Sequence, residues 1–151
     1  MTVDVKAKLA ELGLELPEAA LPVAAYIPAV RTGNLVFTAG QLPLVKGAIP
    51  YIGKVDGGVT PEQAKEMAQV CILNAIAAVG LVADINNIER VVQVRGFVNG
   101  VSGFVGHPGV VNGASELLIH IWGDEKGKHA RTAIGVAELP LNAPVEIELI
   151  V

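Results

Sequence analysis

The sequence of 151 residues has a single cysteine, Cys71. One cysteine can form neither a disulfide within the chain nor a cysteine-based zinc site. We expect Cys71 to be a small buried residue of a helix rather than a reactive thiol. A lone cysteine also fits a reducing compartment, so we expect a cytoplasmic protein.

Charged and aromatic residues are also scarce, at 17% and 4% of the chain, whereas 52% of the residues are hydrophobic. This composition excludes a disordered chain and favours a large core, with apolar surface to bury against further copies of the chain. The net charge is −4, and the one local basic cluster consists of Lys126, Lys128, His129 and Arg131. On its own this cluster is typical of a solvated loop next to a strand, and we expect no nucleic-acid partner.

No targeting or membrane segment is evident. The first residues carry charges at Asp4, Lys6 and Glu11, where a signal peptide would need an apolar run. The most apolar stretch, 67–83, is interrupted by polar residues and is shorter than the ~20 residues that span a bilayer. It is typical of a buried helix, so we expect no membrane partner.

The usual catalytic motifs are missing as well. The chain has no nucleophile elbow, no phosphate-binding loop and no dinucleotide fingerprint. The histidines His107, His120 and His129 lack metal-ligand spacing, and we interpret each as a surface or capped residue. We therefore expect no metal and no cofactor.

The order of predicted elements indicates one α+β domain. Thr60, Pro61 and Gln63 form a strong helix start. Periodicity predicts helices at 3–12, 60–83 and 109–122, strands at 25–30, 34–41, 88–98, 131–138 and 145–151, and a loop at 42–59. The first two strands are expected to form a hairpin around 31–34, and the last two a second hairpin. After the N-terminal helix the order is β-β-α-β-α-β-β, which favours a sheet with two helices on one face.

The two C-terminal strands carry the residues of greatest chemical interest. Alternation places Arg131 and Ala133 on one face of their strand, and Glu146 opposite the apolar face of the last strand. An arginine and a glutamate from one hairpin can form a plain salt bridge. They can also form a site in which the arginine binds a carboxylate and the glutamate moves protons.

The segment HARTAIGVAELPLNAPVEIEL, which begins at His129, resembles the signature of the reactive-intermediate deaminase family, also called YjgF-like or L-PSP endoribonuclease-like. Tyr26 followed by RTGNLVFTAGQLP at 31–43, Phe97-Val98 and Val111-Asn112 extend the match upstream. The resemblance covers residues 22–151, with residues 1–21 forming an N-terminal helix and lead-in that are similar to those of a longer subgroup of the family.

This resemblance implies a chorismate-mutase-like α+β fold that assembles as a homotrimer with an inner barrel and clefts between subunits. It also implies the residues of a site for a small carboxylate substrate. Arg131 and Glu146 would be catalytic, and the substrate would be bound by Tyr26, Gly40, Asn112, Arg131 and Ala133. The implied reaction is hydrolytic deamination of small 2-imino or 2-enamino acids to 2-oxo acids and ammonia.

The sequence departs from the best-known members at two positions of the expected cleft. Ala39 and Ala133 stand where those members have serine and cysteine, which removes two polar groups. Carboxylate binding then survives more readily than turnover, so the alternative is a trimeric protein that binds keto acids without converting them. If the protein is active, these alanines favour substrates with apolar side chains. An endoribonuclease is disfavoured by the acidic charge and by the lack of a histidine acid–base pair.

Overall fold

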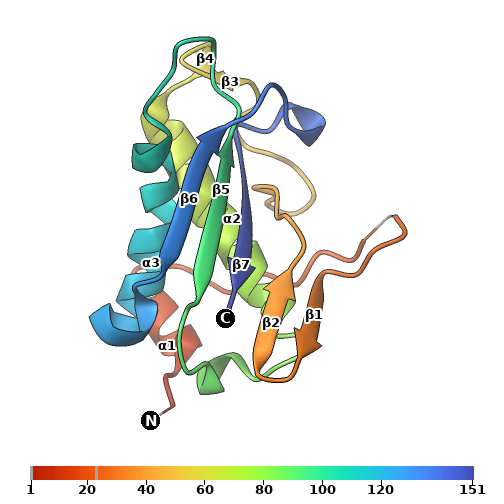
Figure 1. Cartoon of the computed structure of the whole chain (residues 1–151), viewed down its shortest axis with the longest axis vertical. Helices are drawn as coiled ribbons and strands as arrows, with labels where there is room; N and C mark the ends of the chain where they lie inside the picture. The colour runs from red at the N-terminus through yellow and green to blue at the C-terminus, as the bar shows by residue number, and fades with distance from the viewer. Residues whose placement is uncertain (1, 23) are drawn as a thin grey trace.

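Five strands form the main sheet, in the order β1-β2-β7-β5-β6 (Figure 1). The computed structural model describes residues 2–22 and 24–151. The strands are β1 (Ala29–Thr32), β2 (Leu35–Thr38), β5 (Gln93–Val98), β6 (Ala130–Gly135) and β7 (Val145–Ile150). All neighbours are antiparallel except β5 and β6, which are parallel.

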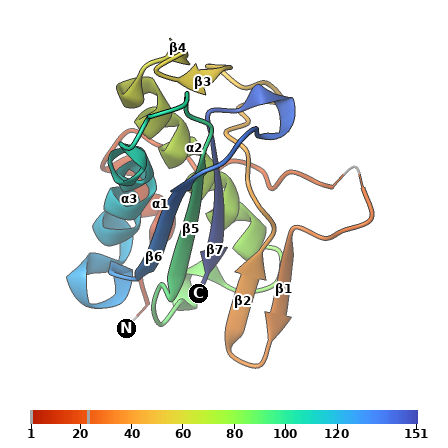
Figure 2. The same cartoon turned by 45° about the horizontal axis from the view of Figure 1, so that its top comes forward.

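The two long helices cover one face of this sheet (Figures 1 and 2). They are α2 (Pro61–Val79) and α3 (His107–Gly127), and the short helix α1 (Val5–Ala10) packs against α3. A small separate sheet is formed by β3 (Lys54–Val55) and β4 (Gly58–Val59), and two short 3₁₀ helices are η1 (Ile85–Asn87) and η2 (Pro140–Asn142). The architecture is α+β with the helices on one face, as the sequence predicts.

The local signals for the start of α2 are confirmed. Thr60 accepts a hydrogen bond from the backbone of Gln63, and the Gln63 side chain accepts one from the backbone of Thr60. This capping box satisfies two backbone donors that a helix start otherwise leaves unpaired. Cys71 lies fully buried on the same helix, as expected.

The prediction of a C-terminal hairpin is wrong, because β5 lies between β6 and β7 in the sheet. The physical reason is the connection through α3. A helix that follows one strand returns the chain beside that strand and parallel to it, which makes β5, α3 and β6 a crossover unit. The segment 136–144 then steps past the end of β5, and β7 pairs on its other side.

Several predicted boundaries also shift. The first hairpin has shorter strands than 25–30 and 34–41, since β1 and β2 together cover only 29–38 around a turn at Gly33, whose φ is +57°. The loop predicted at 42–59 contains β3 and β4. The strand predicted from 88 begins at Gln93, because η1 and the segment after it occupy the preceding residues.

The helix-covered face of the sheet forms the core. Val145, Ile147 and Leu149 of β7 point into it and are at most 1% exposed. Gly96 of β5 points the same way, and a side chain there would collide with Val111 of α3. The glycine therefore lets α3 approach the sheet closely.

The opposite face, called the open face below, carries apolar side chains that the chain itself leaves partly uncovered. By strand register they are Val30, Leu35, Phe37, Phe97, Ile134 and Ile150. An apolar sheet face of this kind is typical of interaction surfaces. Within the described residues, no helix has both the length and the apolar character needed to cross a bilayer.

Close packing of α2 on α3 depends on Gly113, where an added Cβ would overlap the backbone carbonyl oxygen of Lys65. Because backbone cannot rotate away, we expect Gly113→Ala to lower the free energy of unfolding by about 1–3 kcal/mol in urea titrations. The matched control is Gly109→Ala in the same helix, where an added Cβ meets no atom within 4 Å. It should raise stability by about 0.5–1 kcal/mol. Equal effects of the two substitutions would contradict this packing.

Candidate functional site

Arg131 on β6 is held by helix α3. Its Nη1 donates to Oδ1 of Asn112 at 2.7 Å and to Oγ of Ser115 at 3.2 Å. Asn112 and Ser115 are three residues apart, so they lie on the same face of α3. Both hydrogen bonds that Arg131 donates within the described residues come from Nη1, which leaves Nε and Nη2 as the edge that a ligand can meet.

A second pair of hydrogen bonds continues from Ser115. Its hydroxyl lies 2.9 Å from Nε2 of His129, and Nδ1 of His129 lies 2.6 Å from the carbonyl oxygen of Gly127. Burial lowers the pKa of His129 below its ordinary value of 6.5. The hydrogen bond to Gly127 opposes this shift, and the charge of Arg131 adds to it. The imidazole next to Arg131 is therefore favoured in its neutral form.

Glu146 lies on the open face against the backbone of Gly40. A side chain at position 40 would overlap the Glu146 carboxyl, so only glycine leaves room for it there. The loop that carries Gly40 is fixed to β7, because Gln41 and Ile147 exchange backbone hydrogen bonds of 2.8 and 3.1 Å. Burial raises the pKa of Glu146 above its ordinary value of 4.5, and the nearby Glu148 raises it further.

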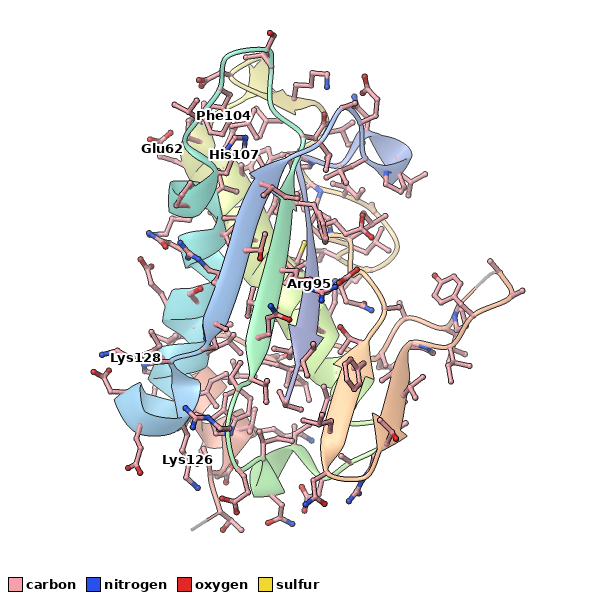
Figure 3. The ribbon with its side chains drawn as sticks, viewed as in Figure 1. Glu62, Arg95, Phe104, His107, Lys126 and Lys128 are labelled. Carbon is pink, nitrogen blue, oxygen red and sulfur yellow. The ribbon has the colours of Figure 1, made fainter. Side chains whose placement is uncertain are left out.

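Glu148 is engaged elsewhere. Its carboxylate lies 3.5 Å from Nη1 of Arg95, which projects from the open face (Figure 3). This pair is solvent-exposed and is worth little to stability. Of the two carboxylates, Glu146 is therefore the half-buried one whose pKa is raised.

Arg131 and Glu146 do not meet within one chain. This corrects the prediction that they lie on one hairpin and form a site there. Arg131 is aligned with Val94 on the helix-covered face, whereas Glu146 is aligned with Phe97 on the open face. They are also offset by three residues, about 10 Å along the strands, and by two strands across the sheet. One subunit therefore presents two separate half-sites, one around Arg131 and one around Glu146.

Three of the other predicted residues divide between these half-sites, whereas no contact within the described residues places Tyr26 in either of them. Asn112 and Ala133 lie with Arg131, and Ala133 follows it by two residues on the same side of β6, opposite Gly96. Gly40 lies with Glu146. Tyr26 precedes β1 and is 52% exposed, and its backbone N–H donates to the carbonyl of Ala24.

A further side chain borders the Arg131 half-site at the end of β6. A Cβ at Gly135 would meet Nε2 of His107 at 2.6 Å, so the imidazole occupies the space that a side chain at 135 would take. His107 packs edge-on against Phe104, with ring centroids 5.3 Å apart (Figure 3). Lys54, Gly135 and these two rings line an open groove of about 560 Å³.

Sequence reasoning missed Ser115, His129 and His107. The spacing of residues in the sequence could have indicated two of them. Ser115 is three residues from Asn112 on a predicted helix, and His129 is two residues before Arg131, on the same side of an extended segment. His107 has no such signal, because its contact with Gly135 depends on how α3 lies over β6.

The arrangement offers an arginine edge for a carboxylate and a carboxyl group suited to proton transfer. Within residues 2–22 and 24–151, no three His, Cys, Asp or Glu side chains gather where they could hold a metal ion.

Comparison with known proteins decides the family. The family model described as "YjgF/chorismate mutase-like, putative endoribonuclease" matches residues 6–151. The chain belongs to the YjgF family.

The chain is similar to other proteins over nearly its whole length. The crystal structure of protein Atu1372 from Agrobacterium tumefaciens is 40% identical with a TM-score of 0.86, and the match covers 97% of this chain and 90% of that one. Protein TCP17 of Trypanosoma cruzi is 35% identical over 148 residues, 97% of this chain and 92% of its own. The 2-iminobutanoate/2-iminopropanoate deaminase of Dermatophagoides farinae is 31% identical over 138 residues, 91% of this chain and 93% of its own.

The raised pKa of Glu146 has a consequence for stability. Between the ordinary and the raised pKa the folded chain binds more protons than the unfolded chain, so the free energy of unfolding falls as pH rises through this window. Glu146→Gln removes this penalty, and we expect it to raise Tm at pH 7 but not at pH 4. Calorimetric scans at both pH values test this.

The control is Glu116→Gln, which removes an exposed carboxylate of α3 and its ion pair with Lys65. It should give no gain at pH 7. A gain from Glu146→Gln that is equal at pH 4 and pH 7 would show that ionisation of Glu146 is not its cause.

Proposed function

We propose that the protein hydrolyses small 2-imino acids and their 2-enamino tautomers to 2-oxo acids and ammonia, in clefts between subunits of a homotrimer. The observation that carries this proposal is the separation of Arg131 from Glu146. Each is prepared for a ligand, yet they lie on opposite faces of one sheet. Two copies of the chain can bring the arginine of one to the glutamate of the other.

The open face gives a physical reason for self-association. Its partly exposed apolar side chains belong to all five strands of the main sheet, including β7, which carries Glu146. Covering them with a second copy removes apolar area from water, which favours assembly by about 25 cal/mol per Å². Closed cyclic symmetry then gives identical clefts around the ring.

In this cleft Arg131 binds the substrate carboxylate through Nε and Nη2, a planar two-pronged contact. Asn112 and Ser115 keep the guanidinium in place through Nη1. The bound carboxylate then positions C2 and its nitrogen along β6, beside the methyl group of Ala133. Gly40, which has no side chain, leaves room for the Glu146 carboxyl against its backbone.

Glu146 moves the protons of the reaction. An enamine first gains a proton at C3 and gives up one from its nitrogen, which makes it the imine. Glu146 takes a proton from water as the water oxygen bonds to C2, and it returns this proton to the nitrogen, so C2 carries a hydroxyl and an amino group. Glu146 then takes the hydroxyl proton and passes it to the amino nitrogen as the C2–N bond breaks, so that ammonia leaves and the C2 oxygen becomes the carbonyl of the 2-oxo acid. A raised pKa suits both roles, because the group must gain and lose a proton near neutral pH.

The relative from Dermatophagoides farinae supports the reaction class by its name, 2-iminobutanoate/2-iminopropanoate deaminase. The family description also includes endoribonuclease. The net charge of −4 disfavours binding to the negatively charged RNA backbone. Deamination is therefore the favoured activity.

A second candidate is a trimer that binds keto acids without converting them. Ala39 and Ala133 favour it, because methyl groups stand where the family's best-known members offer a hydroxyl and a thiol. Both candidates use Arg131 as the anchor. They differ in whether Glu146 meets a water molecule and the imine nitrogen.

The experiment measures ammonia and 2-oxo acid release from imines formed in situ from alanine, 2-aminobutyrate and leucine, beside calorimetric titration with 2-oxobutanoate. We expect Arg131→Lys to lower kcat/KM by at least about 100-fold, because an ammonium cannot make the two-pronged contact. The alanines should favour the apolar leucine-derived imine over the smallest one by about 10-fold.

The control is Arg90→Lys, which replaces an arginine whose Nη2 donates to the carbonyl of Glu125, and it should react like the wild type. Binding of 2-oxobutanoate without turnover of any imine would favour the binding protein over the deaminase. Full activity in Arg131→Lys would refute the anchor.

A further inference from the structure

The hydrogen bonds behind Arg131 have a fixed direction. A carbonyl oxygen only accepts, so Nδ1 of His129 must carry the hydrogen that it shares with Gly127 at 2.6 Å. In the neutral ring Nε2 then has a free lone pair and accepts the hydroxyl hydrogen of Ser115 at 2.9 Å. The oxygen of Ser115 in turn accepts from Nη1 of Arg131 at 3.2 Å.

We infer that His129, acting through Ser115, is a positioning residue for Arg131 that determines which edge of the guanidinium is offered to the substrate carboxylate. The inference rests on the proposed function for its substrate, but its structural part stands alone. This chain of hydrogen bonds, called the relay below, runs from the backbone of Gly127 through His129 and Ser115 to the guanidinium. It holds Ser115 as an acceptor toward Arg131. Nη1 is thereby occupied, and the Nε–Nη2 edge is turned outward.

The neutral state of His129 is essential to this relay. A protonated ring would donate from both nitrogens, and the Ser115 hydroxyl would then lose its acceptor. It would also place a second positive charge next to Arg131. Burial and the charge of Arg131 both disfavour that state. Ser115 is only 9% exposed, so water can hardly replace either partner.

The relay adds to the direct contact with Asn112. Asn112 alone fixes one hydrogen of Nη1, which still allows the guanidinium plane to turn about that bond. A second acceptor on the same nitrogen removes this freedom. A planar two-pronged contact with a carboxylate requires a fixed plane, and groups that orient a binding residue commonly change affinity when they are removed.

Two readouts test the relay without any substrate. Long-range ¹H–¹⁵N spectra of the histidines should show His129 at pH 7 with hydrogen on Nδ1, the tautomer that free histidine disfavours. Arginine ¹⁵N spectra should show slow rotation of the Arg131 guanidinium in the wild type. His129→Phe keeps a ring of similar size but no acceptor, and it should speed that rotation.

The third readout is calorimetric titration with 2-oxobutanoate. We expect His129→Phe to weaken binding by about 10-fold, and His129→Gln, whose amide oxygen can accept from Ser115, to restore most of it. The matched control is His120→Gln, because His120 lies on α3 but contacts the carbonyl of Lys8 and the carboxylate of Glu11. It should leave both the affinity and the Arg131 rotation unchanged.

The outcomes separate the inference from the proposed function. Hydrogen on Nε2 of His129, or unchanged rotation in His129→Phe, would overturn the relay even if imines are deaminated. A wild type that shows the Nδ1 tautomer and slow rotation but binds no keto acid would support the relay and count against the proposed function. Wild-type affinity in His129→Phe would overturn the role of the relay in carboxylate binding.

Discussion

Side-chain alternation across the central strands is the constraint on which the site depends. β5 lies between β6 and β7, so the register fixes which side chains of all three strands share a face. Arg131 turns toward α3 and Glu146 turns away from the helices. A shift of one residue in the β5–β7 pairing would turn Glu146 and Glu148 into the core, and the same shift in the β5–β6 pairing would turn Arg131 away from α3. The core packing therefore determines where the functional groups lie.

Each half-site is supported by the element next to it. Helix α3 supplies Asn112 and Ser115 to Arg131, and the loop before α2 supplies Gly40 to Glu146. The two halves differ in electrostatics. Arg131 is balanced by neutral acceptors that leave its charge available to a ligand, whereas burial disfavours the charged form of Glu146. The two half-sites therefore differ in the way that the proposed anion binder and the proposed proton carrier require.

Much of the local structure was predictable from local sequence. The capping box at Thr60 and the alternation along β7 follow from neighbouring residues, whereas the choice of Arg131 follows from the resemblance to a family signature. The strand order was not predictable from local sequence, because a two-residue period does not reveal which strands become neighbours. The predicted hairpin failed for this reason, since α3 carries the chain back beside β5. Local spacing indicates that Ser115 lies on the same side as Asn112 and that His129 lies on the same side as Arg131, but the contact between Ser115 and His129 depends on how α3 meets β6.

The most direct test of the account mixes two inactive variants. Arg131→Ala and Glu146→Gln are unfolded together in equal amounts and refolded, with mixed trimers confirmed by mass spectrometry. If each cleft takes its arginine and its glutamate from different subunits, about one quarter of the clefts regain both native residues, and imine deamination returns to about a quarter of the wild-type rate. Mixed trimers that stay inactive would contradict a site shared between subunits.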